Sequence, residues 1–291
     1  MITDRRWRCK RRERTLLQLL RGIWLVGVSI ALQVDMGEAK RPFLTEDTDT
    51  VPVGSFELEV ASTLAFDGSN RQLLFPVWGL KAGVADRVDV GLEGGYQFVR
   101  IEGVHEAGFT DTLLKAKVRF YDGSETLPSI GTSVGLVLPT ADRAINPSGD
   151  LGLVALALIQ GDLQLFTYFV NLGVAPIGNP VEQLNQFDEN LVWGVGFEIP
   201  VRQDISLALD FPGATLEDNG VAQSSRFGGI WQSPWQIDFD FAVFVGMTRS
   251  ADNFGFTMGL TYQFPVFGGG KPQQASRRAS NKSLRALHAR P

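Results

Sequence analysis

The stretch Phe254-Gly-Phe-Thr-Met-Gly-Leu-Thr-Tyr-Gln-Phe264 decides the fold, because apolar residues alternate in it with small or polar ones. Successive side chains of a β-strand point to opposite faces, so the stretch predicts a strand with one apolar and one polar face. We count 12 such segments, and most have about the 9–11 residues that cross a bilayer at a tilt. The predicted strands are 55–66, 73–84, 88–98, 111–121, 129–138, 151–160, 163–174, 191–200, 205–211, 226–232, 236–247 and 254–264.

The connections between these strands alternate in length, apart from a near tie between 122–128 and the loops at 67–72 and 248–253. Outer-membrane barrels show this alternation because their periplasmic turns are tight while their outer loops are free to grow. The short connections are 85–87, 122–128, 161–162, 201–204 and 233–235, and the longer ones are 67–72, 99–110, 139–150, 175–190, 212–225 and 248–253.

The predicted fold is all-β, a closed antiparallel up-and-down transmembrane β-barrel of about 12 strands over residues 54–264. A soluble sandwich would turn the apolar faces inward, whereas a membrane barrel turns them toward lipid. Small residues on the polar faces suit a confined lumen, and only closure satisfies every backbone group in lipid. For three strands, 73–84, 151–160 and 226–232, the pattern does not decide which side chains face the lumen and which face the lipid. Aromatic residues near strand ends suit interfacial belts: Phe98, Phe120, Tyr121, Trp231, Trp235, Phe254 and Phe264.

The two ends differ from the barrel in charge. Residues 1–39 hold eight basic side chains, a short apolar run and a small-residue cleavage site after Ala39. They predict a signal peptide, and with it export to the cell outer membrane. Residues 265–291 carry six basic residues and no acid, which predicts a basic disordered tail. No apolar run reaches the roughly 18–20 residues of a membrane helix.

Composition excludes several function classes. Residues 40–264 contain 13 basic and 28 acidic side chains, and this negative charge argues against nucleic acid as a partner. One cysteine, Cys9, rules out a cysteine-based zinc site, and we predict no cofactor. A barrel lipid hydrolase would need a Ser–His pair, but His105 is the barrel's only histidine, so we predict no enzyme.

The barrel region resembles the family of outer-membrane transporters labelled after the meta-pathway of phenol degradation. The matching stretches are Arg41-Pro-Phe-Leu-Thr-Glu-Asp-Thr-Asp49, Val53-Gly-Ser-Phe-Glu-Leu-Glu59, Gly79-Leu-Lys-Ala-Gly-Val-Ala-Asp-Arg-Val-Asp-Val90, Gly108-Phe-Thr-Asp111 with Lys115-Ala-Lys-Val-Arg-Phe120, and Leu136-Val-Leu-Pro-Thr140. The resemblance implies an outer-membrane barrel that conducts small hydrophobic or aromatic, phenol-like molecules. It implies no particular binding residues.

The polar faces place eight acidic and three basic side chains in the predicted lumen. They form either a charge-lined constriction that selects permeants or an internal ion-pair network, and both interpretations stay open. A barrel of 12 strands lies between filled and water-conducting barrels, so we expect a narrow or gated path. The residues are Glu57, Glu59, Asp89, Glu93, Lys115, Lys117, Arg119, Glu198, Asp210, Asp238 and Asp240.

Residues 40–53 precede the first strand and contain Arg41, Glu46, Asp47 and Asp49. We hypothesise that this segment folds into the periplasmic mouth as a plug, and a solvated acidic leader is the alternative. The three carboxylates lack the spacing of a calcium loop, so we predict no metal.

The last strand resembles the signal read by the barrel-assembly machinery, with Gly259, Tyr262 and Phe264 in the characteristic places. The predicted partners are that machinery, outer-membrane lipid and lipopolysaccharide, and a small hydrophobic permeant. Two functions remain open. One is a passive channel, and the other is a structural or adhesive barrel with a filled lumen.

Overall fold

The computed structural model describes residues 41–146, 149–175, 191–215 and 220–266. Within these ranges there is no helix long and apolar enough to cross a membrane. The strands are β1 (Ser55–Asp67), β2 (Asn70–Ala85), β3 (Val88–Ile101), β4 (Val104–Phe109), β5 (Thr112–Tyr121), β6 (Ser129–Leu138), β7 (Gly152–Asp162), β8 (Thr167–Val174), β9 (Leu191–Pro200), β10 (Ile205–Asp210), β11 (Gly213–Thr215), β12 (Val221–Gln232), β13 (Ile237–Gly246) and β14 (Phe254–Pro265).

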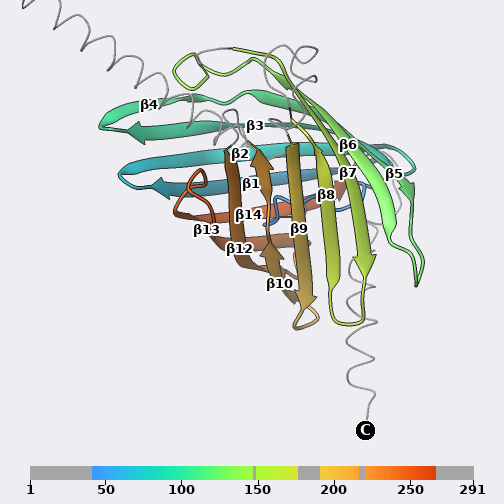
Figure 1. Cartoon of the computed structure of the whole chain (residues 1–291). Helices are drawn as coiled ribbons and strands as arrows, with labels where there is room; N and C mark the ends of the chain where they lie inside the picture. The colour runs from blue at the N-terminus through green and yellow to red at the C-terminus, as the bar shows by residue number, and fades with distance from the viewer. Residues whose placement is uncertain (1–40, 147–148, 176–190, 216–219, 267–291) are drawn as a thin grey trace, which may run out of the picture.

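The strands form one closed antiparallel barrel (Figure 1). β1 pairs with β14 and β12 pairs with β13, so the sheet has no open edge. β4 and β5 lie end to end beside β3, and β10 and β11 lie end to end between β9 and β12. The 14 described strands therefore make a 12-stranded barrel, which confirms the predicted fold.

Both ends of the barrel lie at one rim, because Ser55 of β1 pairs with Pro265 of β14. We call this the terminal rim, and the opposite end the loop rim. The connections 86–87, 122–128, 163–166, 201–204 and 233–236 lie at the terminal rim. The predicted alternation of connections thus corresponds to the two ends of one barrel.

Three connections predicted as loops are partly or wholly strand. Residues 99–110 form a hairpin, in which β3 continues to Ile101 and β4 returns from Val104. Its turn places Glu102 and Gly103 at φ 50° and 87°, the left-handed region that such tight turns require. The connection 67–72 shrinks to two residues, and 212–225 contains β11 and the start of β12. In these places the strands continue to pair beyond the barrel body. The residues typical of turns do not show where that pairing ends, so the sequence predicted loops.

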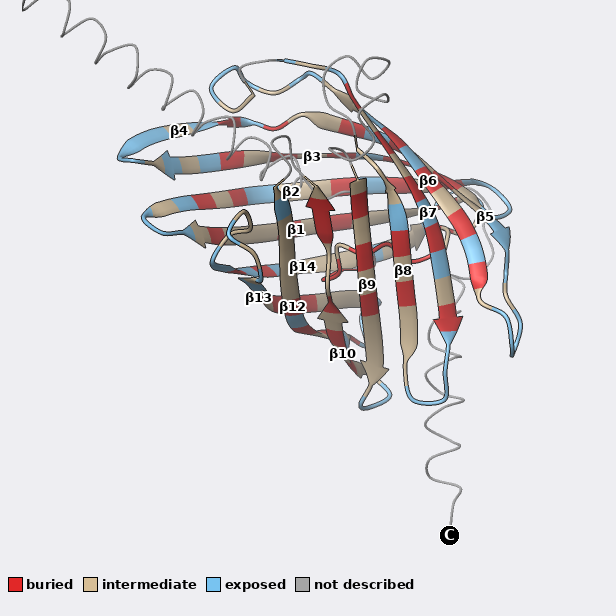
Figure 2. Cartoon of the chain, in the orientation of Figure 1, coloured by how far each residue is buried: buried red, intermediate tan, exposed pale blue. Residues whose placement is uncertain are grey.

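The two faces of the wall differ as the period of two predicts (Figure 2). On β5, Leu114 is 46% exposed on the outer face, while the next residue, Lys115, is 3% exposed inside. β2 keeps no single period, because a bulge between Leu74 and Val77 shifts its register. Before the bulge Gln72 and Leu74 are buried, and after it Gly79 and Lys81 are buried. This bulge is the physical reason for the ambiguous facing of 73–84.

Candidate functional site: the barrel lumen

The eleven charged residues predicted for the lumen are all partly or fully buried. Seven of them are less than 9% exposed: Glu59, Asp89, Glu93, Lys115, Lys117, Asp210 and Asp240. The other four, Glu57, Arg119, Glu198 and Asp238, have intermediate burial. Apolar residues directly next to them on the same strands, such as Leu92, Leu114 and Phe241, are exposed on the outer face.

A cluster of charges lies on the lumen side of β1, β2, β3 and β5. Lys81 Nζ lies 3.1 Å from Glu57 and 2.9 Å from Glu59. Lys115 Nζ lies 3.1 Å from Glu93 on the neighbouring strand. Lys81 was not predicted to face the lumen, because the bulge in β2 breaks the period of two in this strand. Glu198, Asp210, Asp238 and Asp240 come from β9, β10 and β13, outside this cluster.

Residues 41–53, which we call the inner segment, cross the lumen instead of extending from the barrel. Val53 pairs with Gly83 at the terminal rim, and Val51 N–H donates to Asp89 at 3.0 Å. At the other end, Arg41 donates to Asp240 at 3.3 Å and to Thr257 at 2.9 Å. The segment therefore reaches from β2 and β3 to β13 and β14.

The middle of the inner segment binds the lysines of β5. Glu46 is 0% exposed, and its carboxylate lies 3.5 Å from Lys115 and 3.9 Å from Lys117. Lys117 Nζ also donates to Asp47 Oδ1 at 3.0 Å, and Arg119 donates to Asp49 at 2.9 Å. All three acidic residues of the segment thus face cations of one strand.

Backbone and hydroxyl groups of the inner segment are bound on the opposite wall. Asp210 accepts from Leu44 N–H at 2.6 Å and from the Thr45 hydroxyl at 2.5 Å. Asn171 accepts from Glu46 N–H at 2.5 Å and donates to the Glu46 carbonyl at 2.9 Å. Pairing buried polar groups removes most of the penalty of desolvating them. Asp210 and Asp240, two predicted lumen residues, therefore act here as anchors of the segment.

Three lumen-facing glycines leave room for the inner segment. A Cβ at Gly83 would lie 2.2 Å from the Pro52 carbonyl oxygen. A Cβ at Gly194 would lie 2.2 Å from the Thr45 hydroxyl, and one at Gly259 would lie 2.5 Å from Arg41 Nε. At Gly83 the clash is with the backbone of the inner segment, so a larger residue there would displace it, whereas at Gly194 and Gly259 the side chains of Thr45 and Arg41 would have to move.

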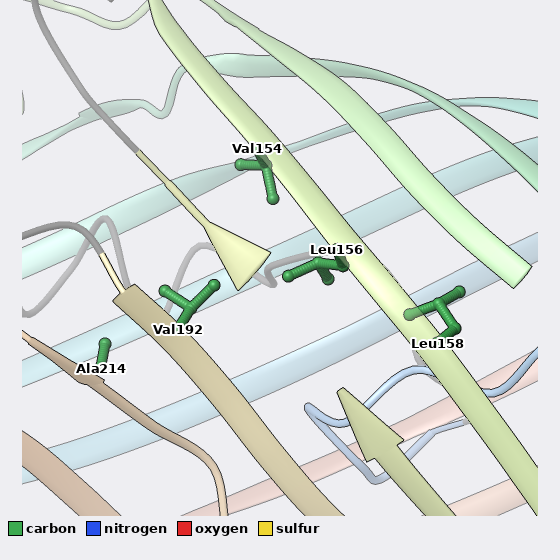
Figure 3. Packing of buried hydrophobic residues seen from close by; sticks show 5 residues of the cluster. All are labelled: Val154, Leu156, Leu158, Val192 and Ala214. Carbon is green, nitrogen blue, oxygen red and sulfur yellow. The ribbon is translucent and has the colours of Figure 1, made fainter. Parts of the chain in front are cut away.

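One side of the lumen is apolar. On β7 the side chains of Val154, Leu156 and Leu158 are buried, and they cluster with Val192 of β9 and Ala214 of β11 (Figure 3). A second buried cluster contains Phe43 of the inner segment, Phe169, Ala208 and Ile230. β7 is apolar on both faces, which explains its ambiguous period. The lumen thus combines a charged side with an apolar side.

A cavity of about 80 Å³ lies between the inner segment and the loop rim, and we call it the loop-rim cavity. Leu44 and Thr45 line it from the inner segment, and Ser250 to Asp252 line it from the β13–β14 connection. The wall contributes Leu156, Asn171, Val192, Trp193, Pro212, Gly213, Ala214, Ala222, Ser224, Arg226 and Phe244. It is a cavity with both apolar and charged lining.

Other predicted residues lie apart from the lumen chemistry. Tyr262 and Phe264 stack on β14 with ring centroids 5.4 Å apart, while Gly259 faces Arg41. His105 is exposed on β4, not in a loop as predicted. In the part of the chain that the structure describes, no group of three or more His, Cys, Asp or Glu residues could hold a metal ion. The predicted signal peptide lies outside the described residues, as does the predicted basic tail from residue 267 on. Pro265, the first residue of the predicted tail, is the last residue of β14.

No known family model matches the chain, and no curated protein matches it either. Among solved structures, it is similar to the COG4313 outer membrane channel from Pseudomonas putida F1, with 13% identity and a TM-score of 0.56. That similarity covers 75% of this chain and 98% of the channel. The KdgM porin (9% identity, TM-score 0.49, 72% and 99% covered) and the CymD monoaromatic hydrocarbon channel (8%, 0.41, 73% and 89%) are weaker neighbours.

The similarity to the first of these structures supports the closed barrel fold and no more. The resemblance to the phenol-degradation family stays a prediction.

Proposed function

We propose that the chain is an outer-membrane barrel that lets small hydrophobic, including aromatic, compounds pass without an energy source. The outer face supports the membrane part of this proposal. In the described ranges, 34 large hydrophobic side chains are exposed, most of them on strands. Soluble monomers rarely expose apolar patches of that extent. Exposed aromatic residues end the strands at both rims, among them Trp235 (68%) and Phe254 (44%), as in interfacial belts.

The apolar side of the lumen is the observation that carries the transport part. The lumen of an outer-membrane barrel is generally polar. Here Leu156, Val192 and Ala214 line the loop-rim cavity, and Phe43, Phe169 and Ile230 form a separate buried cluster. A hydrophobic permeant would contact apolar surface at both clusters, which favours its transfer from water into the lumen.

The inner segment is the proposed constriction. It crosses the lumen between the charged cluster and the apolar side, and Lys115 and Lys117 hold it through Glu46 and Asp47. In this proposal the predicted lumen charges act mainly by positioning the segment. The predicted selection of permeants by a ring of charges is then secondary.

The second candidate is a structural barrel with a filled lumen and no transport. The same buried ion pairs favour it, because a permanently bound segment would close the barrel. The two candidates differ in whether the segment and the apolar side leave a path.

Reconstitution in planar bilayers tests both functions. The channel predicts stepwise conductance for the full-length protein and larger steps after deletion of residues 42–52. The deletion variant must first keep the heat-modifiable migration of a folded barrel. Absence of steps in both proteins would overturn the channel, and equal steps in both would overturn the constriction. Uptake of a hydrophobic dye into vesicles then measures the permeant directly.

A further inference from the structure

A row of directly paired residues crosses the outer face of the barrel near the loop rim, and it changes from aromatic to basic. Phe66 of β1 pairs with Phe254 of β14, and their rings stack with centroids 4.7 Å apart. On its other side Phe66 pairs with Arg71 of β2. Arg71 pairs in turn with Arg100 of β3, and Arg100 pairs with His105 of β4. Residues paired in this way point to the same face of a sheet. The last three side chains are all exposed (Figure 2), and we call them the basic row.

In the described ranges, the arginines of the basic row form no ion pair with a carboxylate. Arg71 and Arg100 lie directly opposite each other, and such pairs of like charges destabilise a sheet. Asp67 and Glu106 each directly follow a residue of this cross-strand row, so their side chains point to the other face. Glu102, two residues after Arg100, lies in the β3–β4 turn, beyond the last pair of the hairpin. The two guanidinium groups can therefore bind an anion from outside the chain.

The next outward-facing row, toward the terminal rim, is apolar. Phe98 and Phe256 of this row are 46% and 38% exposed. Two residues along a strand span about 7 Å, so the outer face changes from apolar to basic within that distance. Arg71 lies at this boundary, with its guanidinium carbon 5.7 Å from the centroid of the Phe66 ring. A side chain that keeps its stem on apolar surface and its charge in a polar layer is typical of a membrane interface. The apolar row consists of Phe256, Leu64, Leu73, Phe98 and Ala107.

A phosphate group fits the basic row better than a carboxylate does. A phosphomonoester carries close to two negative charges and has three acceptor oxygens, so one group can accept from both guanidinium groups and from the imidazole. Arginine forms two parallel hydrogen bonds with phosphate. The side chains of paired residues begin about 5 Å apart, a spacing that one phosphate can bridge. The neighbouring apolar row offers surface for acyl chains, so the two rows together fit a phosphorylated lipid.

We infer that the basic row binds a phosphate group of a membrane lipid, whose acyl chains lie against the apolar row. Lipopolysaccharide, a predicted partner, combines phosphate groups and acyl chains in this way. The inference rests on the membrane part of the proposed function and is independent of transport. It assigns lipid recognition to Arg71 and Arg100, with His105 as a further hydrogen-bond donor.

Native mass spectrometry in detergent micelles tests the inference, because it counts the lipids that stay bound to the full-length protein. The probes are diphosphoryl lipid A, monophosphoryl lipid A with the same acyl chains, and phosphatidylcholine, whose phosphate is paired with a choline. The variants are Arg71→Gln, Arg100→Gln and the double variant. Arg202→Gln is the matched control, since Arg202 is an exposed arginine in the β9–β10 connection at the terminal rim. Each variant must keep the heat-modifiable migration of a folded barrel.

We expect the parent protein to bind diphosphoryl lipid A most tightly and phosphatidylcholine most weakly. An arginine near an anionic lipid surface changes binding about fivefold. The Kd for diphosphoryl lipid A should therefore rise about fivefold in each single variant and about 25-fold in the double variant. It should stay unchanged in Arg202→Gln. Arg71→Lys/Arg100→Lys retains both charges and should bind more tightly than the double glutamine variant.

Three results would overturn the inference. An unchanged Kd in the double glutamine variant, or an equal loss in Arg202→Gln, would mean that binding does not depend on the basic row. Equal binding of the three lipids would mean that the phosphate groups are not recognised.

Inorganic phosphate separates the two sources of this chemistry. If it displaces lipid A from the parent protein when the two are equally concentrated, the row recognises phosphate alone, and the role of the lipid is overturned. The measurement needs no conduction. Bound lipid A in a protein that never conducts would keep the site and refute transport, and conduction without such binding would do the reverse.

Discussion

A substitution of Lys117 tests most directly whether the barrel wall holds the inner segment. Its ammonium donates to Asp47 Oδ1 at 3.0 Å and to the Asp49 carbonyl at 3.1 Å, and it lies 3.9 Å from Glu46. The residue is 2% exposed. Lys117→Met keeps much of the side-chain volume and removes only the cation.

The expected loss follows from burial. Removing one partner of a buried ion pair destabilises by about 3–5 kcal/mol, because the remaining charge stays in a desolvated place. At the lower limit, the fraction of molecules with a displaced segment rises on the order of 100-fold, since about 1.4 kcal/mol corresponds to a factor of ten.

Labelling of Thr48→Cys by an impermeant maleimide reports that fraction, because Thr48 is 1% exposed when the segment is bound. When opening is fast, the labelling rate follows the population of the open form. All variants carry Cys9→Ser, so that the reporter is the single thiol. We expect Lys117→Met to be labelled on the order of 100 times faster than the parent.

The matched control is Arg87→Met. Arg87 pairs with Asp122 at the terminal rim, where the two side chains are 44% and 47% exposed. Surface pairs contribute about 0–1 kcal/mol, so labelling should change by less than about fivefold. The double variant Lys117→Met/Asp47→Leu also removes the carboxylate nearest to the lysine and should recover part of the protection. If Lys117→Met is labelled no faster than Arg87→Met, the segment is not held by this cation.

Three further predictions follow from the same structure. Gly83→Ala places a methyl group against the backbone of the inner segment, so labelling of Thr48→Cys should rise while the barrel stays folded by circular dichroism. Leu92→Arg, on the outer face, should lower the free energy of unfolding in vesicles by about 2–4 kcal/mol if this face meets lipid; Val104→Arg, on the hairpin beyond the barrel body, should change it by less than about 0.5 kcal/mol. Burial and the nearby Asp67 raise the pKa of Asp252 to about 6, against the opposing effect of Arg226. Asp252 is therefore charged above pH 6 and neutral below. Cation selectivity, measured from reversal potentials, should fall between pH 7.5 and pH 5. In Asp252→Asn this fall should be absent or smaller.

The alternation of residues was enough to predict the barrel. Strands such as Phe254–Pro265 have one apolar face over their whole length, so pattern and pairing agree. The pattern failed where a local event breaks the period, as at the bulge of β2, and where both faces are apolar, as on β7. It also could not distinguish a long loop from the β3–β4 hairpin, since both are rich in polar residues.

The contacts of the inner segment were beyond a sequence pattern, because they join residues that lie far apart in the chain. Arg41 and Asp240, for example, are separated by 199 positions. One feature of the sequence does point to these contacts. Three glycines face the lumen next to the inner segment: Gly83, Gly194 and Gly259. In an empty barrel a larger side chain would fit at these positions. Glycine there is consistent with another part of the chain lying close.

The path of the inner segment also bears on how the protein is assembled. Its partners are distributed from β2 to β14, so they are all in place only after the first and last strands have met. The segment precedes every strand in the chain, yet it can complete its contacts only at the final stage. Burial of Arg41, which bonds to β13 and β14, would then report barrel closure, and a chain stalled before β1 meets β14 would leave this part of the inner segment exposed.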